Sequence, residues 1–322
     1  MAPEGFAKPW VEFEEEFGER PLLPYDSVEA CVEGFAKIGA KLASLYTFPA
    51  PDPAVKTEDK TIEGGLKIRI YTPEGYSGGN PVGVYYHSGG WAMSDIDGDD
   101  ASCRTISKGG NVVLVSVAFG LAPQNKHPGL INDCWKGLQW TLDNAKALGG
   151  IEGKFFTAGV SAGGQLAIAL ALKSIDEAMG ESLVGVVAEI PATIHPDGVP
   201  EAMQSKYTSY TEHANNTIDT DKAMRAFWKA FSTSPTDPYG SVLLHQKIKD
   251  LKKVYLTVAS HDTLRDDGLL FKQKLDDSKV PYKFDFYEGY PHYHWTWPSA
   301  KLDKPRDEYN ANVAKGVQWL IS

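Results

Sequence analysis

The chain has 322 residues, of which 42% are hydrophobic and 23% charged, and its net charge at pH 7 is −10. The acidic balance argues against nucleic acid or an anionic membrane as a partner, because both require a basic surface. No uninterrupted apolar run approaches the roughly 18 residues of a membrane span, and the acidic N-terminus lacks the apolar core of a signal peptide. The cysteines lie far apart, at Cys31, Cys103 and Cys134, so we expect a reduced protein located in the cytoplasm.

Short apolar runs alternate with longer helical patterns through most of the chain. Residues 1–50 have a helical pattern and end in the proline-rich stretch TFPAPDPAV. We predict strands at 66–73, 81–89, 111–119, 154–160, 183–191, 252–260 and 282–289. We predict helices between and after them at 131–148, 162–175, 264–278 and 307–321. Strands that alternate with helices imply an α/β fold with a mainly parallel sheet flanked by helices.

Two segments depart from this alternation, residues 1–50 and residues 193–235, and both carry many aromatic side chains. Segments of this kind commonly form pockets and lids at the mouth of a site. We therefore predict an N-terminal cap segment at 1–50, and a second domain at 51–322 that carries a cap insertion at about 193–235. The alternative is that both segments decorate the surface and that their aromatics fill a core of their own.

A glycine-rich turn follows the predicted strand at 81–89, with the sequence His87-Ser88-Gly89-Gly90-Trp91. Open α/β sheets bind ligands at the carboxyl ends of their strands. Glycine lets the backbone approach a ligand closely, and the tetrahedral intermediate of acyl transfer needs backbone N–H donors at its oxyanion. We assign the oxyanion donors to the N–H groups of Gly89, Gly90 and Ala162.

The sequence GVSAGG at 159–164 joins the strand at 154–160 directly to the following helix. This is the G-x-S-x-G pattern in the strand–turn–helix context that it requires. Gly159 and Gly163 allow the sharp turn, which leaves the Ser161 hydroxyl exposed at the carboxyl edge of the sheet. The helix N-terminus that follows directs free N–H groups and a partial positive charge toward a developing anion. Ser161 is therefore the candidate nucleophile.

Taken together, these blocks resemble those of the hormone-sensitive-lipase-like (HGGG-type) carboxylesterases of the α/β-hydrolase superfamily. The blocks are HSGGW at 87–91, AFGLAPQ at 118–124, GVSAGGQLA at 159–167, DTLRDDG at 262–268 and GYPHYHW at 289–295. The resemblance covers roughly residues 65–322 and implies an α/β-hydrolase fold with a helical cap, residues 51–322 being the catalytic domain. It implies a serine esterase without cofactor or metal. Family members are often homodimers.

The chain departs from the family pattern at positions next to the expected site. Ser88 stands where the family has a glycine, and its side chain would narrow the oxyanion loop. Val160 replaces an acidic residue before the nucleophile, which removes a charge from the turn. The expected substrate-binding residues are His87, Ser88, Trp91, Val160 and His294. These departures affect substrate range and rate rather than the class of reaction.

A serine nucleophile needs a histidine base, and that imidazole needs a carboxylate to fix its tautomer. Asp262 follows the predicted strand at 252–260, the position of a triad acid in the chain order Ser, Asp, His. Position alone admits either His292 or His294, since alternate residues of an extended chain face the same side. The family spacing G-x-x-H, counted from Gly289, selects His292 as the base.

The expected function is hydrolysis of carboxylic esters of small, short-acyl metabolites through an acyl-enzyme intermediate. One alternative keeps the pocket and uses it for dehydration or cyclisation of a natural product. The other alternative is a ligand-binding receptor without catalysis, against which the presence of Ser161, Asp262 and His292 argues. The alternating aspartates of DIDGDD at 95–100 lack the glycine and glutamate of a calcium loop, and we interpret them as a solvated helix start.

Overall fold

The structure is a computed structural model, and it describes residues 5–322. An eight-stranded sheet forms its centre, with strand order β1-β2-β4-β3-β5-β6-β7-β8. The strands are β1 Val55–Thr61, β2 Lys67–Pro73, β3 Val82–Tyr86, β4 Leu114–Ala118, β5 Phe155–Val160, β6 Leu183–Glu189, β7 Val254–Ala259 and β8 Tyr282–Tyr287. β2 pairs antiparallel with both β1 and β4, and the other neighbours pair parallel. The predicted α/β class with a mainly parallel sheet is confirmed.

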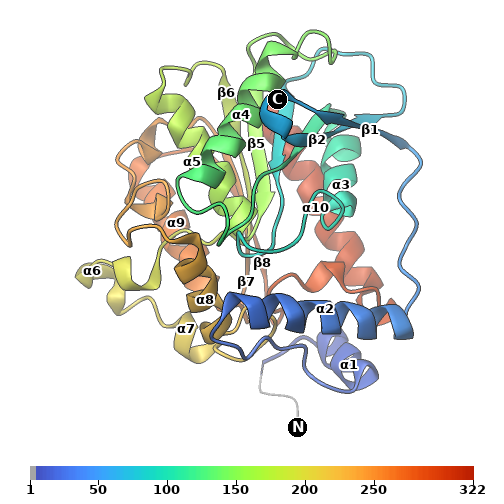
Figure 1. Cartoon of the computed structure of the whole chain (residues 1–322), viewed down its shortest axis with the longest axis vertical. Helices are drawn as coiled ribbons and strands as arrows, with labels where there is room; N and C mark the ends of the chain where they lie inside the picture. The colour runs from blue at the N-terminus through green and yellow to red at the C-terminus, as the bar shows by residue number, and fades with distance from the viewer. Residues whose placement is uncertain (1–4) are drawn as a thin grey trace.

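Helices cover both faces of this sheet (Figure 1). On one face α3 (Asp100–Gly110) packs against α10 (Asp303–Ile321), and their apolar residues join one of two buried clusters. The other face is covered by α4 (Gly129–Asp143), α5 (Ala162–Asp176) and α9 (Arg265–Ser278), which belong to the second cluster. β3, β5 and β7 are buried along their whole length, as expected for strands covered on both faces.

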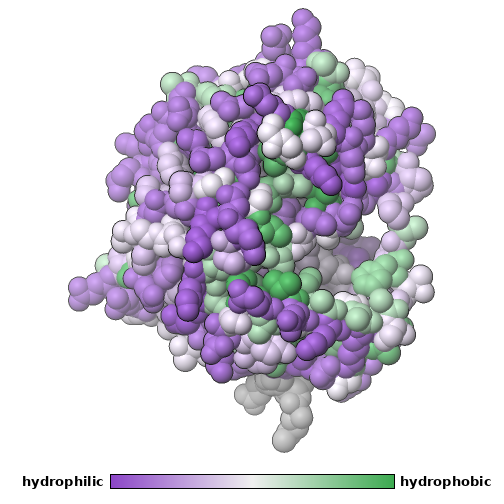
Figure 2. All heavy atoms as spheres, in the orientation of Figure 1, coloured by the Kyte–Doolittle hydropathy of each residue, from purple (hydrophilic) through white to green (hydrophobic). Residues whose placement is uncertain are grey.

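The remaining helices gather at the carboxyl end of the sheet. α1 (Lys8–Phe17) and α2 (Val28–Leu45) cross this end of the molecule, and α6 (Glu201–Gln204), α7 (Ser209–Glu212) and α8 (Asp221–Phe231) lie beside α9 (Figure 1). α2 and α8 contact each other, although they come from distant parts of the chain. In the same orientation, hydrophobic residues gather in the middle of the visible face just above α2, with hydrophilic residues around them (Figure 2).

The structure departs from the predicted elements in a few places. β1 was not predicted, since six of its seven residues are exposed and it has no apolar pattern. The predicted strand at 81–89 ends at Tyr86, because the residues after it form the glycine-rich turn. The DIDGDD stretch does lead into a helix, α3, but Asp99 at its N-cap is buried rather than solvated. Within residues 5–322, none of the helices has the length and apolarity needed to cross a bilayer.

Candidate active site

Ser161 lies in a sharp turn between β5 and α5. Its backbone has φ 57° and ψ −119°, a conformation that costs energy for a residue other than glycine and is typical of functional sites. The turn requires glycine on both sides, because a Cβ on Gly159 would lie 2.2 Å from the Gly163 carbonyl oxygen, and one on Gly163 would lie 2.0 Å from the Tyr86 oxygen. The predicted strand–turn–helix geometry is therefore present, with the Ser161 side chain at the carboxyl edge of the sheet.

The structure brings Ser161, Asp262 and His292 together. His292 Nε2 lies 3.0 Å from Ser161 Oγ, and His292 Nδ1 lies 2.7 Å from Asp262 Oδ2. The other carboxylate oxygen of Asp262 accepts a hydrogen bond of 2.7 Å from the backbone N–H of Leu264. The three side chains come from the loops after β5, β7 and β8, so the parallel sheet delivers them to one edge. This is the geometry of a nucleophile, a base and a carboxylate that orients the base.

Burial determines the charge states of His292 and Asp262. His292 is 4% exposed, and burial lowers the pKa of its imidazole below the ordinary value, so the ring is neutral at pH 7 and able to accept a proton. Burial raises the pKa of Asp262 to about 6, which leaves this carboxyl mainly ionised at pH 7. The resting site thus holds a neutral base beside a carboxylate, the charge state that activation of serine requires.

The glycine-rich turn lies opposite Ser161. Gly89 and Gly90 have φ values of 110° and 59°. A Cβ on Gly89 would lie 2.1 Å from the Met93 carbonyl oxygen, and one on Gly90 would lie 2.6 Å from the Phe227 ring. Both positions therefore require glycine, for backbone conformation and for space. Gly89, Gly90 and Ser161 line one cavity, and Ala162 begins α5 directly after Ser161.

A buried polar network that the sequence analysis missed fixes this turn. Asp99 is 2% exposed and accepts hydrogen bonds from the Ser88 N–H (2.7 Å), the Ser88 hydroxyl (3.0 Å) and the Tyr85 hydroxyl (3.0 Å). It also accepts a hydrogen bond from the hydroxyl of Tyr293, the residue after the base. Asp99 therefore connects the glycine-rich turn to the loop that carries His292. The serine at position 88 was a signal for this network, because it adds a hydroxyl where the family has glycine.

The cavity at Ser161 and His292 has a volume of about 180 Å³. A dry apolar cavity of about 150 Å³ binds benzene, so this space suits a small organic group. Its wall combines the core with the two cap segments, and the apolar side chains contributed by those segments are Phe35 of α2, Ile218, and Met224 and Phe227 of α8. Residues of the segments 5–50 and 193–235 thus both line the cavity beside Ser161.

Of the five residues expected to bind substrate, Ser88 lines this cavity, and the other four lie in the packing around it. The His87 ring stacks on Phe119 at 4.1 Å. Trp91 stacks on Phe231 at 4.6 Å. Val160 has no exposed surface. The His294 ring stacks on Tyr290, and burial lowers its pKa to about 3.

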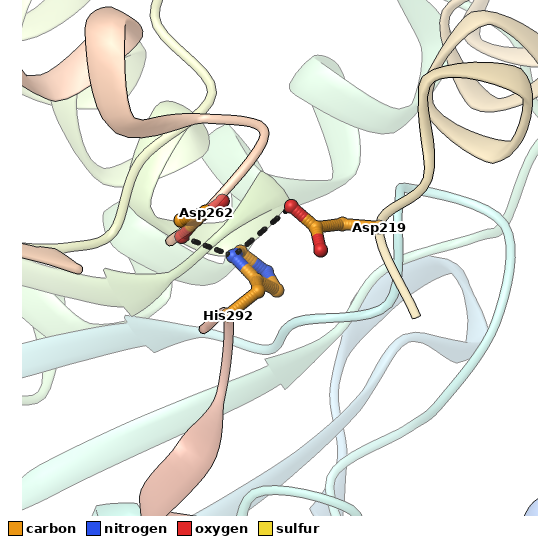
Figure 3. A group of neighbouring side chains, drawn as sticks. All are labelled: Asp219, Asp262 and His292. Atoms are coloured by element: carbon orange, nitrogen blue, oxygen red, sulfur yellow. Dashed lines mark hydrogen bonds and ion pairs between the residues drawn. The ribbon is translucent and has the colours of Figure 1, made fainter. Parts of the chain in front are cut away.

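A second carboxyl group, Asp219, faces the base (Figure 3). Its Oδ2 lies 3.8 Å from His292 Nδ1, and the side chain is 4% exposed. Asp219, Asp262 and His292 lie close enough to hold a metal ion, but His292 already uses both ring nitrogens in the contacts to Ser161 and Asp262. No sequence motif marked Asp219, which lies between α7 and α8.

The comparisons with known proteins agree with this geometry. A family model described as alpha/beta hydrolase fold matches residues 83–296. The versiconal hemiacetal acetate esterase of Aspergillus parasiticus is 39% identical over 315 residues, which are 98% of this chain and 98% of that protein. The esterase LipI of Mycobacterium tuberculosis is 30% identical over 258 residues, 77% of this chain and 78% of that protein.

Solved structures give the same result at the level of the fold. The crystal structure of vibralactone cyclase superposes with a TM-score of 0.85 at 25% identity, covering 98% of this chain and 95% of the other. A hyperthermophilic esterase from Pyrobaculum calidifontis superposes with a TM-score of 0.80 at 25% identity, covering 98% of each chain. The chain therefore belongs to the hormone-sensitive-lipase-like carboxylesterase family of the α/β-hydrolase fold, and it is a carboxylesterase-type hydrolase.

Proposed function

We propose that this enzyme hydrolyses short-acyl esters of small metabolites through an acyl-enzyme formed on Ser161. The observation that carries the proposal is the pair of contacts made by His292, 3.0 Å to Ser161 Oγ and 2.7 Å to Asp262 Oδ2. A neutral imidazole so placed takes the serine proton through Nε2 while Asp262 holds the Nδ1–H tautomer. Ester hydrolysis by the named relatives supports the same reaction class.

The chemistry follows in two halves. Ser161 Oγ attacks the ester carbonyl and His292 Nε2 receives its proton. The N–H groups of Gly89, Gly90 and Ala162 stabilise the oxyanion, and His292 then returns the proton to the leaving alcohol. In the second half His292 takes a proton from the water that attacks the acyl-enzyme, and it then gives this proton to Ser161 Oγ as the bond between the acyl group and Oγ breaks and the acid is released. No group other than these residues and water is required to balance the reaction.

The short-acyl preference rests on the size and the wall of the cavity. Its volume of about 180 Å³ leaves little space beside Ser161, and Phe227 packs directly against Gly90. We propose that residues 1–50 and 193–235 act as a cap that closes the site through Phe35 and Phe227. The relative named for an acetate ester is consistent with a small acyl group.

Labelling and turnover test this proposal together. Ser161 should react covalently with an organophosphonate, and the enzyme should hydrolyse p-nitrophenyl esters with kcat/KM highest between acetyl and butyryl. The Ser161→Ala variant is the control for both readouts. A maximum at acyl chains of about ten carbons would contradict the short-acyl claim, because such chains exceed a cavity of this kind.

The similarity to vibralactone cyclase favours a second candidate, a cyclisation or elimination at the same site. In that reaction the oxyanion donors and His292 would serve proton transfer within one natural product rather than hydrolysis. Labelling of Ser161 without turnover of any p-nitrophenyl ester would favour this candidate over the esterase.

A further inference from the structure

Asp219 brings a second carboxyl group to the catalytic base. It lies between α7 and α8, in the segment proposed as the cap insertion, and the next residue, Thr220, donates a hydrogen bond of 2.5 Å to the Leu23 carbonyl oxygen. Thr220 also caps α8 by accepting the Ala223 N–H. These anchors hold the Asp219 side chain in place, with Oδ2 directed toward His292 and Asp262 (Figure 3).

The surroundings of Asp219 do not favour a negative charge. Its Oδ2 accepts one backbone hydrogen bond, 3.1 Å from the Thr263 N–H, and its buried Oδ1 has no partner among the described residues. Asp262 accepts two hydrogen bonds of 2.7 Å, from His292 and from Leu264. Two buried carboxylates beside a neutral imidazole would repel each other without a compensating cation, so the pair retains one proton.

Within the described part of the chain, the one cation that acts on this pair favours the ionised form of Asp262, because the charge of Arg265 lowers the pKa of that carboxyl, which burial raises. Arg265 of α9 pairs with Asp266 and Glu212. The remaining titratable neighbours of the Asp219–Asp262 pair are Tyr210 of α7 and Asp267 of α9, and neither brings a positive charge. Burial, followed by the charge of Asp262, raises the pKa of Asp219 well above its ordinary value. Asp262 accepts two short hydrogen bonds and Asp219 only one longer bond, so the proton belongs to Asp219.

We propose that Asp219 is a positioning residue of the triad: a neutral carboxylic acid, supplied by the cap insertion, whose O–H donates to Asp262. When His292 takes the serine proton, the imidazolium keeps its Nδ1–H directed at Asp262. The bond from Asp219 holds that carboxylate in place and makes it less basic, so the proton remains on the imidazole. The inference rests on the proposed acyl-enzyme function, and it makes the cap insertion part of the catalytic machinery.

Two substitutions test whether Asp219 is a neutral hydrogen-bond donor or a second anion. Asp219→Asn keeps a neutral donor of nearly the same shape, so kcat should stay within about threefold of the parent and the acid limb of the pH profile should not move. Asp219→Leu removes the donor, so kcat should fall about 10- to 100-fold, the factor for one hydrogen bond to a charged group. The control is Asp221→Asn, two residues along, whose carboxylate pairs with Arg225 at 2.8 Å and makes no triad contact.

The result that would overturn the proposal is a loss in Asp219→Asn as large as that in Asp219→Leu, with an acid limb moved to lower pH. That shift would mean that Asp219 is an anion that stabilises the imidazolium. A Leu variant that folds and retains full kcat would also overturn it, because the donor would then have no role.

An infrared measurement separates this proposal from the proposed esterase function, because it does not depend on turnover. The difference spectrum between the parent enzyme and Asp219→Asn at neutral pH should contain the carbonyl band of a protonated carboxylic acid. A carboxylate band in its place would contradict the neutral state, even if the enzyme proves to act on no ester. If the acid band is present and no ester is cleaved, the esterase proposal fails while the charge state of Asp219 stands.

Discussion

At the scale of single residues, the two histidines of GYPHYHW have opposite environments although both are buried. His292 contacts Ser161 Oγ and Asp262, whereas His294 stacks on Tyr290 and Trp295 packs edge-on against its ring. The loop after β8 explains the difference, because Tyr293 between them adopts φ 63°. This left-handed residue breaks the extended geometry in which positions i and i+2 would face the same side.

Substitutions of His292 and His294 should therefore have different effects on kcat. Ser161→Ala and His292→Ala should each lower kcat at least about 10³-fold, since triad residues act as a unit. His294→Phe keeps an aromatic ring against Tyr290 and should change kcat far less. Steady-state kinetics on p-nitrophenyl acetate provide the measurement. An active His292→Ala beside an inactive, folded His294→Phe would reverse the assignment of the base.

The charge state of His292 predicts the acid limb of the pH profile. Burial lowers the pKa of this imidazole, and the protonated ring cannot accept the serine proton. Activity should therefore fall as the pH drops, with the midpoint of kcat/KM in the free enzyme below the ordinary histidine value of about 6.5. A midpoint clearly above that value, or a rate that stays flat across it, would contradict a buried neutral histidine as the base.

Asp99 should affect both stability and rate. In Asp99→Asn the new amide group would face donors where a carboxylate now accepts four hydrogen bonds. We expect a loss of about 1–3 kcal/mol in the free energy of unfolding, the cost of unsatisfied buried groups, together with a lower kcat because the glycine-rich turn beside Ser161 is no longer fixed. Asp97→Asn is the control, since its side chain is 72% exposed and pairs with Arg69. Equal effects of both substitutions in denaturant unfolding and in kcat would rule out a special role for Asp99.

At the scale of elements, we propose that α8 of the predicted cap limits the size of the acyl site. Phe227 of α8 lies against Gly90 and lines the cavity, while Phe231, one turn later, stacks on Trp91 outside it. Phe227→Ala should raise the ratio of kcat/KM for hexanoyl over acetyl esters about tenfold, because it opens space beside Ser161. Both Phe→Ala changes should cost about 3–5 kcal/mol of stability. If Phe231→Ala changes the ratio as much as Phe227→Ala does, the cap does not set acyl size through this contact.

The elements that the sequence predicted well are those whose burial leaves a local pattern. β3, β5 and β7 are apolar along their length because both faces are covered. β1 has the sequence VKTEDKT and one buried residue. It is a strand because it pairs with β2, and this pairing leaves no local pattern in the sequence of β1. α3 was predicted only at its start. It ends in Gly109 and Gly110, poor helix formers that allow close packing on Ala314 and Val317 of α10.

The residues of the site likewise divide into those that a local sequence pattern marks and those that depend on tertiary contacts. Ser161 and Asp262 each follow a strand in a local motif, and the family spacing from Gly289 separates His292 from His294, so these three could be predicted without knowledge of the tertiary structure. Asp219 and Asp99 could not be found in this way. Asp219 accepts a hydrogen bond from Thr263, 44 residues away, and Asp99 joins Ser88 to Tyr293, which lies 194 residues from Asp99. An isolated aspartate carries no signal of burial. The side chains beside the motif residues were also unpredictable, because their direction depends on how each turn packs.

At the scale of the whole molecule, the site depends on segments from the entire chain. The sheet and the helices on its two faces hold the loops after β3, β5, β7 and β8 at one edge. α2 near one end of the chain and α8 in the insertion then meet over that edge. The α/β core thus positions Ser161, Asp262 and His292, and residues of two distant segments line the cavity beside them. Changes at the cavity-wall residues Phe35 and Phe227 should alter substrate preference before they alter the reaction, whereas Asp219 acts on the triad.

If the reaction passes through an acyl group on Ser161, that acyl group should be observable on the enzyme. The enzyme is mixed with p-nitrophenyl acetate, quenched in acid within the first turnovers, digested and measured by mass spectrometry. The account predicts a burst of p-nitrophenol and one acetyl group on the peptide that contains Ser161, both absent in Ser161→Ala. Sustained hydrolysis by the parent enzyme with no acetyl group on Ser161, or an undiminished rate in Ser161→Ala, would contradict it.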